Sequence, residues 1–400
     1  MRLLYLIAED WPTHRADLVA LFGKYLPRRG VMSDIVCGSE ALPPPNWPGG
    51  QALCCPLRGG MARRRASTFW HACKVLWQRG RLEHCDAIQV RDMPAVATVA
   101  WLVARWRGLP LYYWMSYPIP DGQIATALER GLSSGWMKFL YPLLVGALGR
   151  VLLYRWVLRQ ADHVFVQSAQ MKRDLQARGI PGGRMTPVPM GVDLEVMQPE
   201  QIEPMVDDRL LGRRVLVYLG TLDRTRRPEV MLDMLALLRQ QEPQALLVMA
   251  GDDPDPVHLA SLKQHAANQG VAEHVIWTGW LPMAQAWRWV KAAEVALSPF
   301  PRGYLLDSAS PTKVPEYLML GVPVVCNDNP DQEDLIKRLG GGLVKPYTAE
   351  EFLLGVGELL QGNCFSRHSA AQGISGERDY EMLANYVANE YSRLNKVDNG

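Results

Sequence analysis

The stretch VLVYLGTLDRTRRPEVMLDMLALLRQQEPQALLVMA, residues 215–250, contains a complete strand–helix–strand unit. Its first five residues are apolar and predict a buried strand, and the apolar run 245–250 predicts a second one. Between them, residues 229–241 repeat apolar side chains with the period of a helix. Pro228 suits the start of that helix, because a residue in the first turn needs no N–H donor. A helix that connects two buried strands is typical of a parallel sheet.

The same alternation continues on both sides of this unit. Apolar runs predict further strands at 3–8, 34–37, 86–90, 111–115, 162–167, 274–277, 295–297 and 322–326. Helical patterns separate them at 15–26, 94–107, 169–178, 258–269, 283–293 and in a short helix that ends near Leu320, whereas the Pro-rich run 117–122 predicts an irregular turn. The sequence therefore predicts an α/β fold with two Rossmann-like, doubly wound domains.

The chain has 400 residues, which is more than one hydrophobic core normally serves, so we expect two domains. The segment 199–204 is rich in proline and acidic residues, and we interpret it as the linker. The predicted organisation is an N-terminal domain over 1–200 and a C-terminal domain over 201–378. A terminal helix over 379–400 is expected to pack back toward the N-terminal domain.

Composition indicates a folded, soluble chain, because 48% of the residues are hydrophobic and 21% are charged. The seven cysteines lack the spacing of metal or redox motifs, which favours free thiols in a reducing compartment. The N-terminus has no secretory-signal pattern, and the nearest candidate span, 139–149, is short and contains Pro142. We therefore expect a cytoplasmic location. A basic first half and an acidic second half suggest different partners, or simply a solubilising surface.

The loop 220–227 joins the strand to the helix of the opening unit and contains three arginines. Backbone N–H groups and the positive end of a helix dipole favour an anion at such a place. Arginine adds donors whose geometry matches phosphate oxygens. The loop is therefore a candidate phosphate site, and the alternative is a solvated basic loop.

A second candidate is DSASPTKVPE, residues 307–316. Its small residues would let the backbone approach a ligand, and a helix begins directly after them. Pro315 fits the first helical turn, where the dipole also favours the Glu316 carboxylate. Gly321 suits the end of this helix. The simpler interpretation is that Glu316 is only a first-turn acid.

Several short motifs occur in an order and spacing that resemble one known family, the retaining GT-B glycosyltransferases of family 4, which build bacterial polysaccharides and glycolipids. The match covers about 160–360 well and the first half only by pattern. The motifs are Gly191-Val192-Asp193, the loop 220–227, Gly251-Asp252, Thr278-Gly279-Trp280-Leu281 and EYLMLGVPVV at 316–325. The resemblance implies two domains that face each other across a cleft, with the acceptor on the N-terminal domain and a nucleotide-sugar donor on the C-terminal one.

The resemblance also implies roles for single residues. Glu316 matches the second glutamate of the family's E-x7-E motif, which binds the donor ribose. Arg226, with Arg224 as the alternative, matches the basic residue at the donor diphosphate, and Lys313 is a second phosphate partner. The other donor-binding positions are Gly220 and Thr221 in the first loop, Trp280 and Leu281 beside the nucleobase, and Ala309, Ser310, Pro311 and Thr312 in the loop whose amides hold the phosphates.

This chain departs from the family pattern in two places. Ser308 stands where the first glutamate of E-x7-E is expected, and Asp307 is one residue away from that position. Ser308 could hydrogen-bond a sugar hydroxyl without supplying charge. The histidine found in many members near the start of the N-domain cleft is missing, since the corresponding turn has the sequence Ser116-Tyr117-Pro118, and we assign no general base.

The expected reaction is a hexosyl transfer that retains the anomeric configuration. Arg226 and Lys313 would stabilise the charge on the departing diphosphate, and no metal or other cofactor is expected. The donor would be a nucleotide-diphosphate-sugar and the acceptor a glycan or a lipid-linked sugar, with no nucleic acid involved. Two rivals remain: a nucleotide-sugar epimerase, and a catalytically silent partner of another transferase, which Ser308 would suit.

The N-terminal half contains Arg63-Arg64-Arg65 and an amphipathic stretch over 136–158. Basic groups beside exposed aromatic and aliphatic side chains suit an anionic membrane surface. The sequence thus suggests a peripheral protein at the inner face of the cytoplasmic membrane. The alternative for 136–158 is a buried core helix.

Overall fold

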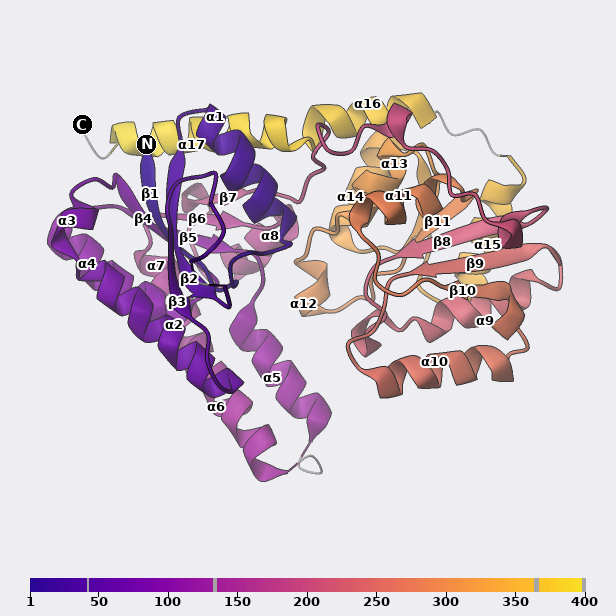
Figure 1. Ribbon diagram of the computed structural model, residues 1–400, viewed down its shortest axis with the longest axis horizontal. Helices are drawn as coiled ribbons and strands as arrows, with labels where there is room; N and C mark the ends of the chain where they lie inside the picture. The colour runs from indigo at the N-terminus through magenta and orange to yellow at the C-terminus, as the bar shows by residue number, and fades with distance from the viewer. Residues whose placement is uncertain (42, 132–134, 363–366, 398–400) are drawn as a thin grey trace. The chain divides into compact units, whose positions relative to one another are not determined.

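A computed structural model describes residues 1–41, 43–131, 135–362 and 367–397 of the chain. It divides the chain into two compact units, of which the first comprises Met1–Met190 with Tyr380–Gly400 and the second Gly191–Asp379. Figure 1 shows the elements of each unit. The predicted α/β fold with two doubly wound, Rossmann-like units is confirmed.

The first unit is built on a parallel sheet of seven strands in the order β3-β2-β1-β4-β5-β6-β7. Its strands are β1 (Arg2–Leu6), β2 (Met32–Ser39), β3 (Ala52–Pro56), β4 (Ala87–Arg91), β5 (Leu111–Met115), β6 (His163–Val166) and β7 (Met185–Pro187). The helices are η1 (Asp17–Tyr25), α1 (Leu26–Arg28), α2 (Met61–Leu76), α3 (Arg79–Leu82), α4 (Pro94–Arg107), α5 (Ile119–Arg130), α6 (Trp136–Val151), η3 (Leu152–Val157), α7 (Leu158–Gln160), α8 (Ala169–Ala177), η4 (Gly182–Arg184) and α17 (Tyr380–Val397).

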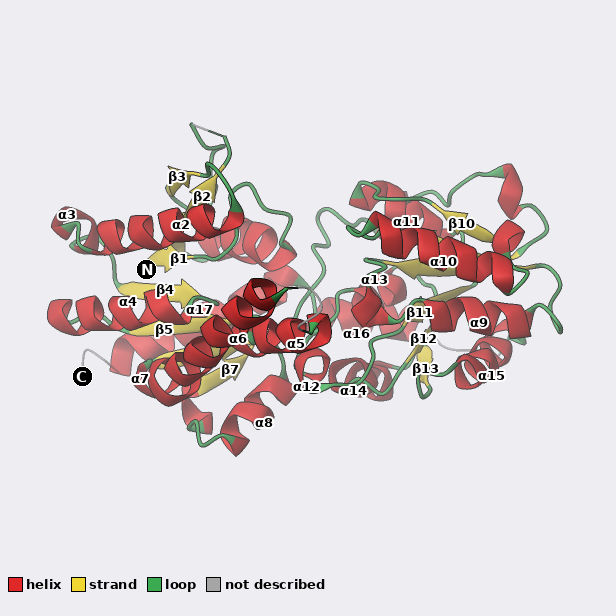
Figure 2. Cartoon of the chain, turned by 90° about the horizontal axis from the view of Figure 1, so that it is seen from below, coloured by secondary structure: helices red, strands yellow, loops and turns green. Residues whose placement is uncertain are grey.

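The second unit has six parallel strands in the order β10-β9-β8-β11-β12-β13. They are β8 (Arg214–Leu219), β9 (Ala245–Ala250), β10 (Val275–Trp277), β11 (Val295–Ser298), β12 (Val324–Cys326) and β13 (Gly342–Val344). Around them lie η5 (Pro199–Gln201), η6 (Asp208–Leu210), η7 (Arg224–Arg226), α9 (Glu229–Leu238), α10 (Pro256–Asn268), η8 (Ala272–His274), α11 (Met283–Lys291), α12 (Tyr304–Asp307), α13 (Lys313–Met319), α14 (Pro330–Leu339), α15 (Ala349–Leu360) and α16 (Arg367–Glu377). In Figure 2 the strands of this unit lie among helices on both sides.

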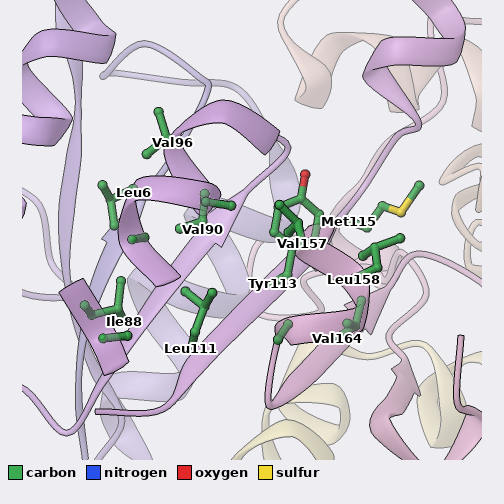
Figure 3. Packing of buried hydrophobic residues seen from close by; sticks show 14 of the residues in the cluster. Leu6, Ile88, Val90, Val96, Leu111, Tyr113, Met115, Val157, Leu158 and Val164 are labelled. Atoms are coloured by element: carbon green, nitrogen blue, oxygen red, sulfur yellow. The ribbon is translucent and has the colours of Figure 1, made fainter. Parts of the chain in front are cut away.

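Each sheet is buried on both faces, as expected where crossover helices cover a parallel sheet. Neighbouring residues of β1 alternate between the faces: Leu4 and Leu6 pack with α2, α4 and η3, whereas Leu3 and Tyr5 pack with η1 and α17. Figure 3 shows part of the first of these clusters from close by, with labelled side chains from β1, β4, β5, α4 and η3. Burial on both faces explains why the strands are continuous apolar runs.

The division between the units falls between Met190 and Gly191, earlier than the linker predicted at 199–204. That segment and the residues on either side of it are attached to the second unit. Met197 is fully buried in its core, the Met205 amide donates to the Arg288 carbonyl at 2.9 Å, and the Lys291 ammonium donates to the Pro199 carbonyl. The proline and acidic residues therefore belong to a surface segment that is bound to the second unit. Its composition is the same as that of a free linker, so composition alone could not distinguish the two.

Three local expectations differ from the structure. The irregular turn predicted at 117–122 becomes the first turn of α5, which accommodates Pro120 because it lies at a position that needs no helical N–H donor. The elements β3, α2 and β7 were missed, since their apolar runs are short or interrupted. The continuous helix Trp136–Gln160 is long and apolar enough to cross a membrane by length and composition, and only 11% of its most apolar window is buried. The alternative of a buried core helix is therefore wrong for α6, but it holds for Leu153, Tyr154, Val157 and Leu158, which lie in the core.

Candidate functional site

The candidate site of the second unit lies at the carboxyl ends of β8 and β11. These neighbouring strands mark the place where the strand order reverses, and ligands of doubly wound sheets bind at such a point. The helix α9 packs on one face of the sheet and α13 on the other. The loop before each helix therefore leaves the same edge of the sheet in a different direction.

The loop after β8 is held in a fixed shape by Asp223. Its carboxylate accepts hydrogen bonds from the Thr221 hydroxyl at 2.8 Å and the Thr225 amide at 3.0 Å. Burial raises the pKa of Asp223, but these hydrogen bonds and the charge of Arg226 outweigh it and hold the pKa below its usual value. Asp223 is therefore an anion that organises the loop around a cation.

The backbone of this loop also contacts the loop after β9. Gly251 has a φ of 155°, and a Cβ added there would lie 1.9 Å from the Gly220 carbonyl oxygen. The two strand ends can approach this closely only because Gly251 has no side chain. Gly220 in turn lies beneath the Lys313 side chain, whose Cε would be 2.5 Å from an added Cβ.

Arg226 is the best-organised cation of the loop. Its guanidinium lies 4.0 Å from the centroid of the Phe300 ring, and its Nε is 3.8 Å from Asp223 Oδ2. The side chain is 20% exposed, yet Nε and Nη1 are buried and have no hydrogen-bond partner among the residues that the structure describes. Buried donors are normally paired, so these two are available for an anionic acceptor.

Phe300 is itself fixed by the next strand. The Phe300 amide donates to Asn327 Oδ1 at 2.6 Å, and Asn327 Nδ2 donates back to the Phe300 carbonyl at 2.8 Å. Asn327 directly follows β12 and is fully buried. Sequence reasoning missed this support, although an asparagine directly after a buried strand is the kind of signal that could have indicated it.

Arg224 differs from Arg226 in its surroundings. Its side chain is 67% exposed and lies 3.7 Å from Asp255. It faces a hollow of about 340 Å³ whose other lining residues are Glu229, His258, Ser261, Leu262 and His265. The geometry therefore favours Arg226 as the organised cation.

Lys313 is a second cation at the site. Its Nζ donates to the Tyr218 hydroxyl at 3.0 Å and lies 4.3 Å from the centre of that ring. Burial lowers the pKa of the Lys313 ammonium, and the charge of Arg226 lowers it further. A bound anion would oppose both effects and raise the pKa of Lys313, because opposite charge favours the protonated form.

Glu316 lies in the first turn of α13, as predicted. Burial raises its pKa to about 7, against the opposing effects of the Trp287 indole, the Lys313 charge and Thr312. The next residue fixes the helix: the Tyr317 hydroxyl accepts from the Leu219 amide at 2.8 Å and donates to the Leu297 carbonyl at 3.3 Å. Tyr317 thus connects α13 to β8 and β11, and it keeps Glu316 and Lys313 at the strand ends.

Ser308 and Asp307 are occupied by contacts within the second unit. Ser308 is 2% exposed, and its hydroxyl donates to the Leu305 carbonyl at 3.0 Å. The Asp307 carboxylate pairs with Arg302 through two hydrogen bonds of 2.8 and 3.1 Å. A sugar contact by Ser308 remains a prediction and would require its side chain to turn.

The loop from Ala309 to Thr312 offers fewer amides than the resemblance implies. The Ala309 amide donates to the Leu306 carbonyl at 3.2 Å, and Pro311 has no N–H. The Ser310 hydroxyl donates to Asp331 at 2.9 Å and accepts from the buried Arg378 at 2.9 Å. Backbone contacts to a phosphate would therefore fall to Ser310, Thr312 and the first residues of α13.

Trp280 and Leu281 follow β10, two strands away from β8. Trp280 is exposed, whereas Leu281 is partly buried against the core. The structure brings their loop close to the Gly251 turn, since a Cβ at Gly279 would lie 3.7 Å from Asp252 Oδ2. Within the described ranges there is no group of three or more His, Cys, Asp or Glu side chains that could hold a metal ion.

A buried polar cluster, which sequence reasoning missed, lies at the corresponding edge of the first sheet. Arg91, at the end of β4, has no exposed surface and pairs with Glu9 at 2.9 Å and Asp17 at 2.8 Å. Asp92 follows with a φ of 54° and accepts from the Ser116 amide at 2.9 Å and from the Ser116 hydroxyl. Burial raises the pKa of Asp92 to about 6, although Arg91 opposes it.

This Asp92 cluster contains the turn in which the resemblance led us to look for a histidine. The signal in the sequence was the Arg91-Asp92 pair directly after a buried strand. Elsewhere in this unit, the basic run Arg63-Arg64-Arg65 lies at the start of α2, with Arg64 paired to Glu40 at 2.7 Å.

Two family models match the chain. The Glycosyl transferases group 1 model matches residues 206–375, and the Glycosyl transferase 4-like domain model matches residues 18–191. The protein belongs to the group 1 glycosyltransferase family. The match to the first model includes Arg226, Lys313 and Glu316.

Two curated proteins are similar to part of this glycosyltransferase. It is 28% identical over 258 residues to a GDP-mannose-dependent alpha-(1-6)-phosphatidylinositol monomannoside mannosyltransferase of Mycolicibacterium smegmatis, which covers 63% of this chain and 64% of the relative. It is 25% identical over 197 residues to a D-inositol 3-phosphate glycosyltransferase of Jonesia denitrificans, covering 46% and 44%. The matches thus span less than two thirds of each relative.

Solved structures share the GT-B fold of this glycosyltransferase. Anabaena HepE in complex with UDP has a TM-score of 0.69 at 14% identity, covering 98% of this chain and all of HepE. Sucrose-phosphate synthase from Thermosynechococcus elongatus has a TM-score of 0.70 at 15% identity, covering 98% and 99%. A Listeria monocytogenes protein described as a UDP-N-acetylglucosamine 2-epimerase has a TM-score of 0.56 at 12% identity, covering 96% and 94%. The shared fold therefore does not separate transferase from epimerase.

Proposed function

We propose that this chain transfers a hexosyl group from a nucleotide-diphosphate-sugar to a glycan or lipid-linked acceptor, with retention of the anomeric configuration. The proposal depends most on the geometry of Arg226. Its buried donors Nε and Nη1 have no hydrogen-bond partner among the described residues, and its guanidinium is fixed by the Phe300 ring and the ion pair with Asp223. Such preorganised donors stabilise charge that develops in a transition state without needing to reorganise.

Arg226 and Lys313 would bind the donor diphosphate together. Lys313 lies against Gly220 and Tyr218, and the charge of Arg226 acts on both Lys313 and Tyr218. In the absence of an anion the two cations repel each other. A diphosphate would neutralise this repulsion and stabilise the charged form of Lys313. The two cations would then stabilise the negative charge on the departing nucleoside diphosphate. The proposed scheme therefore uses no metal.

Glu316 would accept a hydrogen bond from a donor ribose hydroxyl. It lies in the same helix as Lys313, one turn further along, and is nearly buried. The raised pKa of Glu316 would fall on binding, because a hydroxyl donor stabilises the carboxylate. We place the reaction in bacterial polysaccharide or glycolipid synthesis on the cytoplasmic side of the membrane.

The proposal is tested by a panel of nucleotide-sugars in a thermal-shift assay with the full chain. A ligand at about 100 times its Kd stabilises the folded state by about 2.7 kcal/mol, which is readily seen as a rise in Tm. The matching donor, incubated with acceptor extracts, should then give a product whose new anomeric linkage matches that of the donor by NMR. Arg226→Gln should abolish the thermal shift, whereas Arg209→Gln, on an exposed surface of the same unit, should preserve it.

Other outcomes distinguish the rivals. Donor binding without transfer to any acceptor would favour the silent partner, which the internal hydrogen bond of Ser308 also suits. Interconversion of the sugar with donor alone would indicate an epimerase. The absence of a shift with every nucleotide-sugar would refute the donor site itself.

A further inference from the structure

The outer face of α6 carries a continuous apolar stripe. Its side chains recur every three or four residues, so they share one side of the helix. Each is between 53 and 65% exposed: Met137, Tyr141, Leu144, Leu148 and Val151. Isolated apolar side chains are common on protein surfaces, but a stripe along four turns of one helix marks an interaction site.

The opposite side of α6 is fixed against α5. Gly146 is buried there, and a Cβ at this position would lie 2.8 Å from both Ile124 Cγ1 and the Pro120 carbonyl oxygen. Figure 1 shows α5 and α6 as a pair that extends from the sheet of the first unit. Because the two backbones touch at Gly146, the outward orientation of the stripe is built into the fold.

The following segment anchors this pair in the core. The helix continues without interruption into η3, where Leu153, Tyr154 and Val157 are buried between α4 and the sheet. The exposed apolar stripe is therefore confined to α6, which has 16 residues. At about 1.5 Å per residue it is roughly 24 Å long, less than the ~30 Å hydrocarbon core of a bilayer. Its length suits a position in the plane of a membrane interface and is too short for a span.

The charge on α6 and on the segment that follows it has one sign. Residues 131–161 contain no aspartate or glutamate, but they contain Lys138, Arg150, Arg155 and Arg159. Lys138, Arg155 and Arg159 are exposed, and Arg150 lies 3.3 Å from Asp121 on α5. Lysine and arginine beside an apolar helix face are complementary to anionic lipid head groups. A protein partner or a second copy of this chain would have to supply matching acidic groups.

We propose that the outer face of α6 docks the protein onto an anionic bilayer, with the stripe at the boundary between head groups and acyl chains. Tyr141 and Trp136 would lie at head-group depth, and the basic side chains would contact lipid phosphates. The inference deepens the proposed function and rests on it in one respect only, because a lipid-linked acceptor would be presented at this surface.

The test is flotation of the full chain with vesicles of phosphatidylcholine and phosphatidylglycerol at a ratio of about 7:3, an anionic surface of the kind that attracts basic segments. Leu144→Glu with Leu148→Glu should weaken vesicle binding by roughly tenfold or more, since it places two charges at the acyl boundary. Val206→Glu with Leu211→Glu, at exposed apolar positions of the second unit, is the matched control and should bind as the wild type does. Vesicles of phosphatidylcholine alone should bind the wild type several-fold more weakly.

Failure of the wild type to float, or equal binding by the α6 variant and its control, would overturn the proposal. Light scattering after size exclusion supplies the other decisive outcome: a wild-type dimer that the α6 variant makes monomeric, without vesicle binding, would assign the face to a second copy. Thermal shift with a nucleoside diphosphate reports separately on the donor site. Vesicle binding without any nucleotide binding would leave the docking surface standing and refute the proposed function.

Discussion

Replacing Arg226 by glutamine should separate the affinity for nucleoside diphosphates from the stability of the fold. The substitution keeps a polar side chain of similar reach but removes the charge and the two unpaired donors, Nε and Nη1. It also removes the guanidinium from the Phe300 ring. Binding and folding should therefore respond differently.

The expected loss of affinity follows from the two donors. A hydrogen bond to a charged group contributes about 1.5–3 kcal/mol, so two such bonds to a diphosphate give at least about 3 kcal/mol. Since about 1.4 kcal/mol corresponds to a factor of ten, the Kd should rise by roughly 150-fold. Arg226→Lys should restore part of this affinity, because it returns the charge without the bidentate geometry.

The expected change in stability is small. Loss of the cation–π contact costs about 1 kcal/mol, but removal of buried unpaired donors relieves a penalty of about the same size. The free energy of unfolding should thus stay within about 1 kcal/mol of the wild-type value.

The assay pairs isothermal titration with UDP, GDP and ADP with urea unfolding of the same preparations. Arg209→Gln serves as the control for the loss of one exposed arginine. A Kd for Arg226→Gln within twofold of the wild type, for the nucleotide that binds best, would refute the assignment of Arg226. A large drop in stability at unchanged affinity would show that its role is structural.

Three further predictions concern the same unit. Gly251→Ala should lower the free energy of unfolding by more than about 2 kcal/mol in urea titration, because its Cβ would collide with the Gly220 carbonyl; an effect below about 0.5 kcal/mol would contradict the close approach. The pKa of Glu316 is raised to about 7 in the folded state, so protonation stabilises the fold and this contribution is lost as pH rises from about 4.5 through 7; Glu316→Gln should flatten that part of the stability profile by about 3 kcal/mol, and parallel profiles would contradict the raised pKa. Asn327→Ala should cost about 1–3 kcal/mol of stability and weaken nucleotide binding by roughly tenfold through the freed Phe300 loop, whereas a loss of stability with unchanged affinity would separate Asn327 from the site.

The sequence predicted the strand–helix framework because buried parallel strands are continuous apolar runs. The helix 94–107 and the strand 111–115 coincide with α4 and β5. β3 was missed because Ala52–Pro56 is short, half-buried and ends in proline, so it lacks the apolar run that marks the central strands. Local pattern therefore indicates central strands better than edge strands.

The candidate site was predictable where its residues belong to a local motif. Arg226, Lys313 and Glu316 lie in two loop–helix segments that sequence spacing identifies. Phe300 and Asn327 were not found, because their pairing joins residues 27 positions apart and depends on the register of β11 with β12. The hydrogen bond from Ser308 to the Leu305 carbonyl could not be predicted either, because the sequence does not indicate which group a serine hydroxyl will contact.

The C-terminal helix α17 makes the first unit discontinuous in the chain. Tyr380, Leu383, Val387 and Tyr391 complete the core on one face of a sheet whose strands all come from the first 190 residues. During synthesis, the part of that face that α17 covers stays open until the ribosome has translated the entire second unit.

The second unit, by contrast, is one uninterrupted segment whose ends meet, since the Val192 amide donates to the Arg378 carbonyl at 2.7 Å. It can fold while the chain is still being synthesised, whereas the first unit can complete its core only after α17 has been synthesised. A nascent chain stalled near residue 379 would thus present a folded second unit and a partly open sheet face of the kind that chaperones recognise.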